Sequence, residues 1–461
     1  MSETFETLSP IDGAVVVRRP WATAADAERT LSTAREAGPR WRETPLEERT
    51  RLVGALVDAV VARTDVLADE LTLQMGRPRR YSAGEIGGFE ERARRMMALA
   101  PEGLAAVHPP LREGFTRYIT REPLGTVLVL SPWNYPWLTA VNAVVPALLA
   151  GNVVVLKHSE QTPLVSERLV EAADEAGLPP GVLQFIHGSH ELVAQMVADP
   201  RVDFVAFTGS VQGGRAVHRA GAERFIGMGL ELGGKDPAYV LEDAPFEHTV
   251  ENVVDAAFFN SGQSCCAVER VYVHERLYDR FVDATVALVE KYVVGDPRDE
   301  ATTLGPVVRP QNAAAIQAQI DAAVASGAKP LITTPRTDRP PPYLSPQVLV
   351  DVTHEMTVMR EETFGPVVGI MKVRSDEEAI ALMNDSRYGL TASLWTEDIL
   401  RAQRIGRRLE TGTVFMNRAD YLDPDLAWVG VKDSGRGCTL SKLGFEQLTR
   451  PKSFHLRHPP S

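Results

Sequence analysis

The sequence predicts an α/β protein built on parallel sheets, because two regions of the chain alternate between short strands and helices. From Thr126, β-rich runs such as "TVLVLS", "NVVVLKHS", "GVLQFIHG" and "DFVAFTG" are separated by helical stretches such as "TPLVSERLVEAADEAG". A second alternating region begins near Gly233 and includes "ERVYVHE", "PVVGIMKV", "TASLWT" and "GTVFMN". Strands of this length between helices are typical of a parallel sheet that is covered on both faces.

The first hundred residues are predicted to be helical. In "TPLEERTRLVGALVDAVVART", Thr44 can cap a helix and Pro45 suits the first turn. The helix over 162–177 is bounded by Thr162 as a cap, Pro163 in the first turn and Gly177 as a stop. The proline-rich "KPLITTPRTDRPPPYLSP" is predicted to be an exposed loop, and "RPKSFHLRHPPS" contains a strand that pairs outside its own domain.

Composition excludes several function classes. The net charge of −12 over 461 residues gives no electrostatic support for binding nucleic acid or an anionic membrane surface. Three cysteines are too few for a disulfide framework, and "MSETFETLSP" lacks the features of a secretory signal, so the cytoplasm is the expected compartment. The apolar run "TAVNAVVPALLAGNVVVL" is broken by Asn142, Pro146 and Gly151, which indicates buried core segments rather than a membrane span.

The stretch "FFNSGQSCCAVER" places Cys265 and Cys266 side by side among small and amide residues. A buried, inert cysteine is one interpretation. A metal site is disfavoured because adjacent cysteines lack ligand spacing, and no metal is expected. A nucleophilic thiol needs an oxyanion donor and a base, for which Asn134 in "SPWNYPW" and Glu231 in "LELGGKDP" are candidates. A serine hydrolase lacks support because no G-x-S-x-G motif is present.

Six segments occur in order: "SPWNYPW", "GNVVVLKHSEQTP", "FTGSVQGG", "LELGGKDP", "NSGQSCCA" and "EETFGPVVGI". As a set they closely resemble the aldehyde dehydrogenase superfamily over nearly the whole chain. The resemblance implies a Rossmann-like cofactor domain, an α/β catalytic domain and a small β oligomerisation arm. The corresponding ranges are 1–113 and 124–232, then 233–446, then 114–123 with 447–461. It also implies a homodimer or a tetramer, with no nucleic-acid or membrane partner.

The same resemblance implies the chemistry of the site. Cys265 would attack a small-molecule aldehyde, Asn134 and the backbone N–H of Cys265 would hold the oxyanion, and Glu231 would activate water against the thioester. Cys266 matches a neighbour that the chemistry does not require. The cofactor would be NAD, with NADP as the alternative, although no G-x-G-x-x-G motif surrounds Gly209. Its contacts would come from Trp133, Lys157, Glu160, Gly209, Ser210, Glu362 and Phe364; Glu160 favours NAD.

Substrate residues are expected to be mostly aromatic: Tyr135, Trp137, Phe259 and Tyr421, together with Trp133, Leu422 and Trp428. They favour a neutral, medium-sized aliphatic or aryl aldehyde. The alternative is a substrate like succinate semialdehyde, whose carboxylate would pair with Arg418. A CoA-acylating enzyme and an inactive structural relative are further alternatives, against which the presence of Glu231, Cys265 and Asn134 argues. "AWVGVKDSG" departs from the common family ending at Val429, which changes the mouth of the substrate tunnel.

Overall fold

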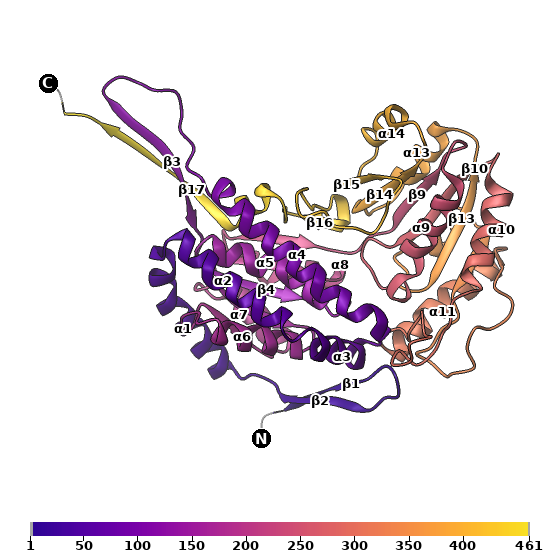
Figure 1. Ribbon diagram of the computed structural model, residues 1–461, viewed down its shortest axis with the longest axis horizontal. Coiled ribbons are helices and arrows are strands. Elements are labelled where there is room, and N and C mark those ends of the chain that lie inside the picture. The colour runs from indigo at the N-terminus through magenta and orange to yellow at the C-terminus, as the bar shows by residue number, and fades with distance from the viewer. Residues whose placement is uncertain (1–2, 460–461) are drawn as a thin grey trace.

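The computed structural model describes residues 3–459, which form two parallel sheets and a protruding two-stranded arm (Figure 1). The first sheet has the strand order β16-β8-β7-β4-β5-β6. Its strands are β4 (Thr126–Ser131), β5 (Val153–His158), β6 (Leu183–Phe185), β7 (Phe204–Thr208), β8 (Gly227–Glu231) and β16 (Gly435–Arg436). β4 to β8 pair in parallel, and β16 runs antiparallel to β8. The order reverses at β4, which is flanked by β5 and β7, so a ligand crevice is expected beyond the carboxyl ends of β4 and β7.

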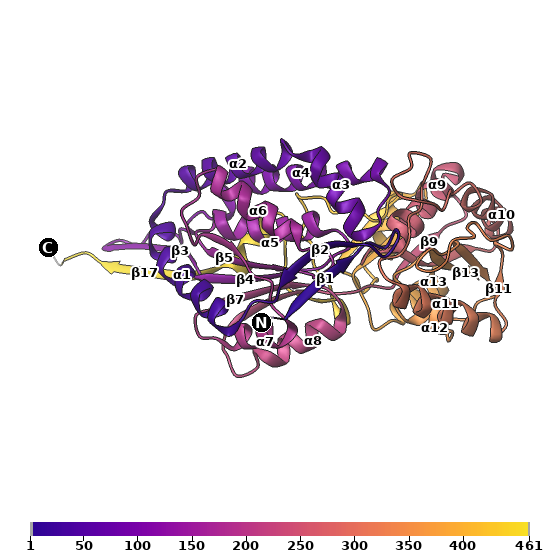
Figure 2. The same cartoon turned by 90° about the horizontal axis from the view of Figure 1, so that it is seen from below.

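Helices cover both faces of this sheet. They are α1 (Ala24–Glu43), α2 (Leu46–Val61), α3 (Thr64–Met75), α4 (Arg79–Gly103), α5 (Pro136–Leu149), α6 (Leu164–Glu175), α7 (His190–Ala198) and α8 (Val211–Ala220). Figure 2 shows α2, α4, α5 and α6 above the sheet, with α7 and α8 below it. β4 and β5 are apolar along almost their whole length because both faces are covered.

The second sheet has the order β11-β12-β13-β10-β9-β14-β15 and is parallel except for the edge strand β11. Its strands are β9 (Asp236–Val240), β10 (Val268–His274), β11 (Lys329–Pro330), β12 (Gln347–Val350), β13 (Val367–Val373), β14 (Thr391–Trp395) and β15 (Thr413–Met416). Its helices are α9 (Phe246–Phe258), α10 (Tyr278–Val289), α11 (Pro310–Ala325), α12 (Thr357–Arg360), α13 (Asp376–Asn384) and α14 (Ile399–Gly406). Only four residues join β8 to β9, so the carboxyl edge of the first sheet faces the amino edge of the second.

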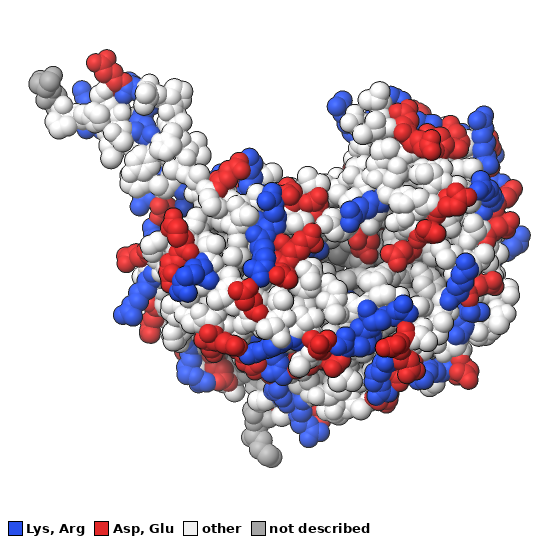
Figure 3. Space-filling view, viewed as in Figure 1, with Lys and Arg blue, Asp and Glu red and all other residues white. Residues whose placement is uncertain are grey.

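The arm consists of β3 (Phe115–Pro123) and β17 (Thr449–Arg457), which pair antiparallel over nine residues. It projects from the body and carries both strands away from the two sheets (Figure 1). The strand predicted in "KSFHLR" is therefore part of a ribbon with 115–123. Figure 3 shows Lys and Arg interspersed with Asp and Glu on one face of the body. Within residues 3–459, no helix combines the length and apolarity that a membrane crossing requires.

Three local predictions differ from the structure. A hairpin of β1 (Thr4–Leu8) and β2 (Val15–Pro20) precedes the helices, although the first hundred residues were expected to be helical. Thr44 ends α1, and α2 begins after Pro45 without a side-chain cap. The hydroxyl of Thr162 is buried without a partner, so this residue does not cap α6. In each case the tertiary neighbours, rather than the local sequence, decide which groups are paired.

The segment 435–448 packs on the first sheet, although the sequence analysis assigned 435–446 to the catalytic range and 447–448 to the arm. β16 extends that sheet beside β8, and the 3₁₀ helix η3 (Lys442–Leu448) contacts α4 and α5. The short 3₁₀ helix η2 (Lys432–Ser434) leads into it. After the second sheet, the chain thus comes back to the edge of the first sheet and places residues 436–439 next to Glu231.

Candidate functional site

The two cysteines lie in a tight loop between α9 and β10. The 3₁₀ helix η1 (Phe259–Gly262) begins this loop, and Asn260, Ser261 and Gly262 all have positive φ, at 54°, 56° and 70°. A Cβ on Gly262 would lie 2.2 Å from the carbonyl oxygen of Gly365, so only glycine fits there. The Gln263 amide donates to the carbonyl of Asn260 at 3.0 Å and accepts from the N–H of Val308 at 2.8 Å. These contacts fix the loop in one conformation.

The thiols have different surroundings. Cys265 is half-buried, whereas Cys266 is 2% exposed. The Sγ of Cys266 donates to Oδ1 of Asp420 at 2.9 Å, and the Ser264 hydroxyl donates to the same oxygen at 2.9 Å. The neighbouring Cys265 and burial raise the pKa of Cys266 well above its ordinary value, and burial also raises the pKa of Asp420. Cys266 is therefore held as a neutral thiol, and Cys265 is the more accessible of the pair.

Asn134 lies beside the thiol loop. It follows β4, directly before α5, and is 5% exposed. Its Nδ2 donates to the carbonyl of Gln263 at 3.2 Å, two residues before Cys265. The buried guanidinium of Arg77 donates to the carbonyl of Asn134 at 2.6 Å and to Oδ1 of Asn260 at 3.2 Å, and it forms an ion pair with Glu85. The sequence analysis did not identify Arg77, which links both segments.

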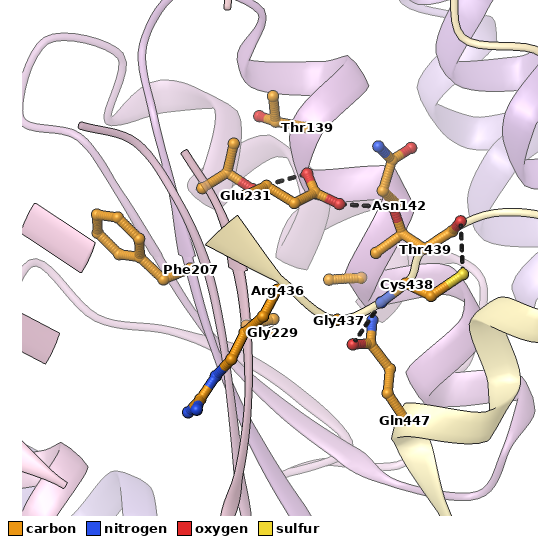
Figure 4. Close-up of a pocket in the computed structure, with 13 residues that line it drawn as sticks. Thr139, Asn142, Phe207, Gly229, Glu231, Arg436, Gly437, Cys438, Thr439 and Gln447 are labelled. Carbon is orange, nitrogen blue, oxygen red and sulfur yellow. Dashed lines mark hydrogen bonds between the residues drawn. The ribbon is translucent and has the colours of Figure 1, made fainter. Parts of the chain in front are cut away.

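Glu231 ends β8 and is half-buried. Oε1 accepts a hydrogen bond from the Thr439 hydroxyl at 2.5 Å, and Oε2 accepts one from the Thr208 hydroxyl at 3.2 Å. Burial raises the pKa of this carboxyl group, while the two threonine bonds act in the opposite direction. The side chain faces a cavity of about 20 Å³ that Asn142 and Cys438 also line (Figure 4). Both threonines were missed because neither lies near Glu231 in the sequence.

A cleft of about 570 Å³ opens beyond the carboxyl ends of β4, β5 and β7. Four of the predicted cofactor residues line it: Trp133, Lys157, Gly209 and Ser210. Burial lowers the pKa of Lys157. The Ser210 hydroxyl caps α8 by accepting from the N–H of Gly213 at 3.1 Å, and the start of the helix faces the cleft. A helix start beside a lysine is suited to an anionic group such as a pyrophosphate.

Glu362 and Phe364 lie on the loop before β13. Oε1 of Glu362 accepts from the N–H of Gly234 at 3.0 Å. Burial, reinforced by Glu269, raises the pKa of Glu362 to about 8. The ring of Phe364 meets the edge of Trp133, with 5.6 Å between the centroids. Phe364 is thus linked to the cleft through Trp133, whereas Glu362 lies against the connection between β8 and β9.

A buried ion pair supports this loop. The carboxylate of Glu269 accepts from the N–H groups of Thr363 and Phe364, each at 2.8 Å. Lys235 donates to the same carboxylate at 2.5 Å and to the Thr363 hydroxyl at 3.0 Å. Sequence analysis missed this pair, although Lys235 lies within "LELGGKDP".

Glu160 is separate from the main cleft. Its carboxylate forms an ion pair with Arg309 at 3.1 Å, and its side chain is 41% exposed. It lines a neighbouring hollow with Trp21 and His190, and His190 borders both hollows. The predicted contact with the adenine ribose therefore involves a carboxylate that already has a cationic partner.

The predicted substrate residues are spread over several environments. The Tyr135 ring lies under the Arg77 guanidinium at 4.4 Å, and Phe259 packs on Tyr81 with 5.3 Å between centroids. Trp137 is 1% exposed and packs against Phe89 in the core. Trp428 is also buried, and Leu422 packs against the core.

Arg418 and Tyr421 form a separate exposed contact. The Arg418 guanidinium stacks on the Tyr421 ring at 3.4 Å and forms no ion pair among residues 3–459. The Tyr421 hydroxyl donates to Glu91 at 3.3 Å. Over the same range, no group of three or more His, Cys, Asp or Glu side chains is arranged to hold a metal ion.

Comparisons with known proteins agree with this arrangement. The profile of the aldehyde dehydrogenase family matches residues 1–454. A succinate-semialdehyde dehydrogenase [NADP(+)] from Deinococcus radiodurans is 35% identical, covering 97% of this chain and 94% of that protein. A succinate semialdehyde dehydrogenase [NAD(P)+] from Escherichia coli is 34% identical, covering 96% of each.

Solved structures give the same result. An NAD-dependent aldehyde dehydrogenase from Sinorhizobium meliloti superposes with a TM-score of 0.95 at 33% identity, covering 100% of this chain and 92% of that one. Betaine aldehyde dehydrogenase from Staphylococcus aureus in complex with NAD+ superposes with a TM-score of 0.94 at 32% identity, covering 100% and 92%. The α/β fold and the NAD(P)-dependent oxidoreductase activity predicted from the sequence are confirmed, and this chain belongs to the aldehyde dehydrogenase family.

Proposed function

We propose that Cys265 is the nucleophile, that Asn134 and the backbone N–H of Cys265 hold the oxyanion, and that Glu231 is the base for deacylation. The observation that supports this assignment most directly is the hydrogen bond from Asn134 Nδ2 to the carbonyl of Gln263, which places the amide beside the thiol loop. Glu231 is the last residue of β8, and the four residues that follow it connect the first sheet to the second. A thiol, an amide donor and a carboxylate are the groups that acyl transfer through a cysteine requires.

The residues would act in two half-reactions. The Cys265 thiolate forms a C–S bond to the aldehyde carbon, and the carbonyl oxygen becomes an oxyanion held by the Asn134 amide. When bound, NAD(P) accepts the hydride that leaves this carbon. A thioester remains on Cys265; Glu231 takes a proton from water, the resulting hydroxide attacks the acyl carbon, and the C–S bond breaks. The carboxylic acid leaves, and the thiolate is restored.

The cleft beyond β4 and β7 fits the dinucleotide. Lys157 and Glu160 would bind the adenine ribose, Gly209 and Ser210 the pyrophosphate, and Glu362 the nicotinamide ribose. Trp133 and Phe364, which pack against each other, would flank the nicotinamide. NAD is the expected preference through Glu160, although its ion pair with Arg309 weakens the repulsion of a 2′-phosphate.

Hydrolysis, rather than acyl transfer to coenzyme A, is the expected second half-reaction because Glu231 is present and held at the site. The test is reduction of NAD followed by absorbance with a panel of aldehydes, with product analysis in the presence and absence of coenzyme A. Acid formation at the same rate under both conditions is expected. A product that forms only with coenzyme A contradicts the hydrolytic assignment, and a lack of turnover with every aldehyde contradicts the enzymatic one.

We also propose a homodimer or a tetramer in the cytoplasm. The arm of β3 and β17 supports association, because a two-stranded ribbon that leaves the body presents unpaired strand edges to a second copy. The three free thiols of the described chain suit a reducing compartment. Light scattering coupled to gel filtration measures the mass in solution, and a monomer would contradict the proposal.

For the substrate, Tyr135, Phe259 and Tyr421 support contacts with an apolar stem near the aldehyde group. The sequence-based preference for a neutral tail, with Arg418 as the anchor of the charged alternative, stays a prediction. Arg418 is exposed and stacked on Tyr421, which is compatible with a position at the tunnel mouth. Arg92, a buried arginine that the sequence analysis did not identify, bears more directly than Arg418 on whether the enzyme prefers a charged tail.

A further inference from the structure

Arg92 is a buried arginine without an acidic partner. It lies on α4 and is 8% exposed. Its Nη1 donates to the carbonyl of Leu138 at 2.8 Å and to Oδ1 of Asn142 at 3.3 Å, and both acceptors are uncharged. Among residues 3–459 it forms no ion pair, in contrast to Arg77 on the same side of the sheet, which pairs with Glu85. A buried cation that forms no direct ion pair is costly, so its presence needs an explanation.

The carboxyl groups around Arg92 are engaged elsewhere. Glu85 pairs with Arg77, Glu231 accepts hydrogen bonds from Thr439 and Thr208, and Asp420 accepts from Ser264 and Cys266. Nε and Nη2 of Arg92 have no partner in the described chain. Unlike Nε of Arg49 and Nε of Arg336, which are enclosed without a hydrogen-bond partner, these two nitrogens are not fully enclosed by the protein. The Nε–Nη2 edge of the guanidinium therefore remains open to a ligand.

The guanidinium lies near the proposed catalytic groups. Asn142, which accepts its hydrogen bond, lines the small cavity with Glu231 and Thr439 (Figure 4). Burial lowers the pKa of Arg92, whereas the nearby carboxyl groups of Glu231 and Glu85 favour its cation. Arginine nevertheless stays protonated in proteins. Phe89 and Ala93 of α4 belong to the same hydrophobic core as Cys266.

We propose that Arg92 binds a carboxylate of the substrate, and that the substrate is a short semialdehyde whose carboxylate lies a few bonds from the aldehyde carbon. A carboxylate supplies two acceptor oxygens for the open Nε and Nη2 edge, in the bidentate geometry that arginine favours. This inference rests on the proposed function. It favours a substrate that carries a carboxylate over a neutral aldehyde. It also assigns the binding of that carboxylate to Arg92 instead of the exposed Arg418.

The first test compares kcat/KM for succinic semialdehyde and for butanal, which has the same number of carbons but no carboxylate. Wild type should prefer the semialdehyde. Arg92→Gln should lose about 10- to 100-fold in kcat/KM for it, mainly through KM, as expected when a charged hydrogen-bonded pair is lost, and should lose much less for butanal. Arg92→Lys should recover part of the loss and serves as the informative variant if the glutamine variant does not fold. Arg94→Gln, which changes an exposed arginine of the same helix, is the matched control.

A second test needs no turnover. Succinate should slow the alkylation of Cys265 by iodoacetamide in wild type, and Arg92→Gln should abolish this protection. Equal loss of activity for both aldehydes, together with no succinate protection of wild type, would overturn the inference and make Arg92 an internal counter-charge. The proposed function would still stand in that case. If no aldehyde is oxidised at all, the proposed function fails, and succinate protection alone still decides whether Arg92 binds a carboxylate.

Discussion

The hydroxyl of Thr439 donates a hydrogen bond to Oε1 of Glu231 at 2.5 Å, although 208 residues separate them in the chain. This bond, together with the one from Thr208, stabilises the ionised carboxylate against the effect of burial. Thr439→Val should therefore raise the pKa of Glu231 further. The acid limb of the pH dependence of kcat should move upward by about 0.5–1 unit, the equivalent of one hydrogen bond. The change is measured in steady-state pH profiles, with the exposed Thr334→Val as control; coincident profiles would show that Thr439 does not hold the base.

Cys265 and Cys266 should respond differently to removal of the thiol. Cys265→Ala should abolish turnover with little change in the thermal unfolding midpoint, because the side chain is small and only half-buried. Cys266→Ala should keep most of the activity, because its thiol is neutral and donates to Asp420, which retains the Ser264 bond. Its stability should fall by about 1 kcal/mol. Wild-type rates in Cys265→Ala would refute covalent catalysis at this residue.

Glu231→Gln should separate the half-reactions. Attack by the thiolate and loss of hydride do not need the base, whereas hydrolysis of the thioester does. A burst of reduced cofactor should precede a slow steady state, and intact-protein mass spectrometry after one turnover should show the added acyl mass on Cys265. Normal steady-state rates without an adduct would remove Glu231 from the base role.

Glu362 should make cofactor affinity depend on pH. Its pKa of about 8 means that the carboxyl group is mostly protonated at neutral pH and ionises as the pH rises. Only the carboxylate is a strong acceptor for ribose hydroxyl groups. The KM for NAD should therefore fall by up to about tenfold between pH 7 and pH 9, as ionisation goes from about a tenth to about nine tenths. Glu362→Gln should give a KM that is high and flat over this range; an unchanged slope would contradict the assignment.

The Glu160–Arg309 ion pair should set the balance between NAD and NADP. Glu160→Gln should lower the ratio of kcat/KM for NAD to that for NADP, because it removes a negative charge near the 2′ position. Arg309→Gln should raise this ratio, because it frees the carboxylate and removes a cation that attracts a phosphate. If neither variant alters the ratio, the adenine ribose does not lie next to this pair.

The sequence predicted the strands of both sheets well because buried parallel strands are short, apolar and bounded by polar turns. "TVLVLS" corresponds to β4 residue for residue, and "TASLWT" contains β14. The hairpin of β1 and β2 was missed because it is half exposed and adjacent to strongly helical sequence. β16 was missed because two residues carry no periodicity, and their pairing with β8 is set by the return of the chain.

The proposed site residues lie inside sequence motifs, whereas the residues that contact them from distant parts of the chain do not. Cys265, Asn134 and Glu231 each lie in a distinctive segment. Arg77, Thr439 and Glu269 hold these segments in place from distant parts of the chain, and nothing in their local sequence indicates a partner. Arg92 was not identified, because burial cannot be seen in a stretch as polar as "FEERARR".

The close approach of Gly262 to Gly365 has a mechanical consequence for the enzyme. The loop that carries the thiol and the loop that carries Glu362 and Phe364 rest on each other without an intervening side chain. A displacement of one loop must therefore displace the other, so the position of the sulfur is tied to whatever lies against the nicotinamide end of the cleft. Binding or release of the cofactor would therefore shift the position of the Cys265 sulfur through direct backbone contact. A substitution in one loop that changes its backbone path would require a matching change in the other loop.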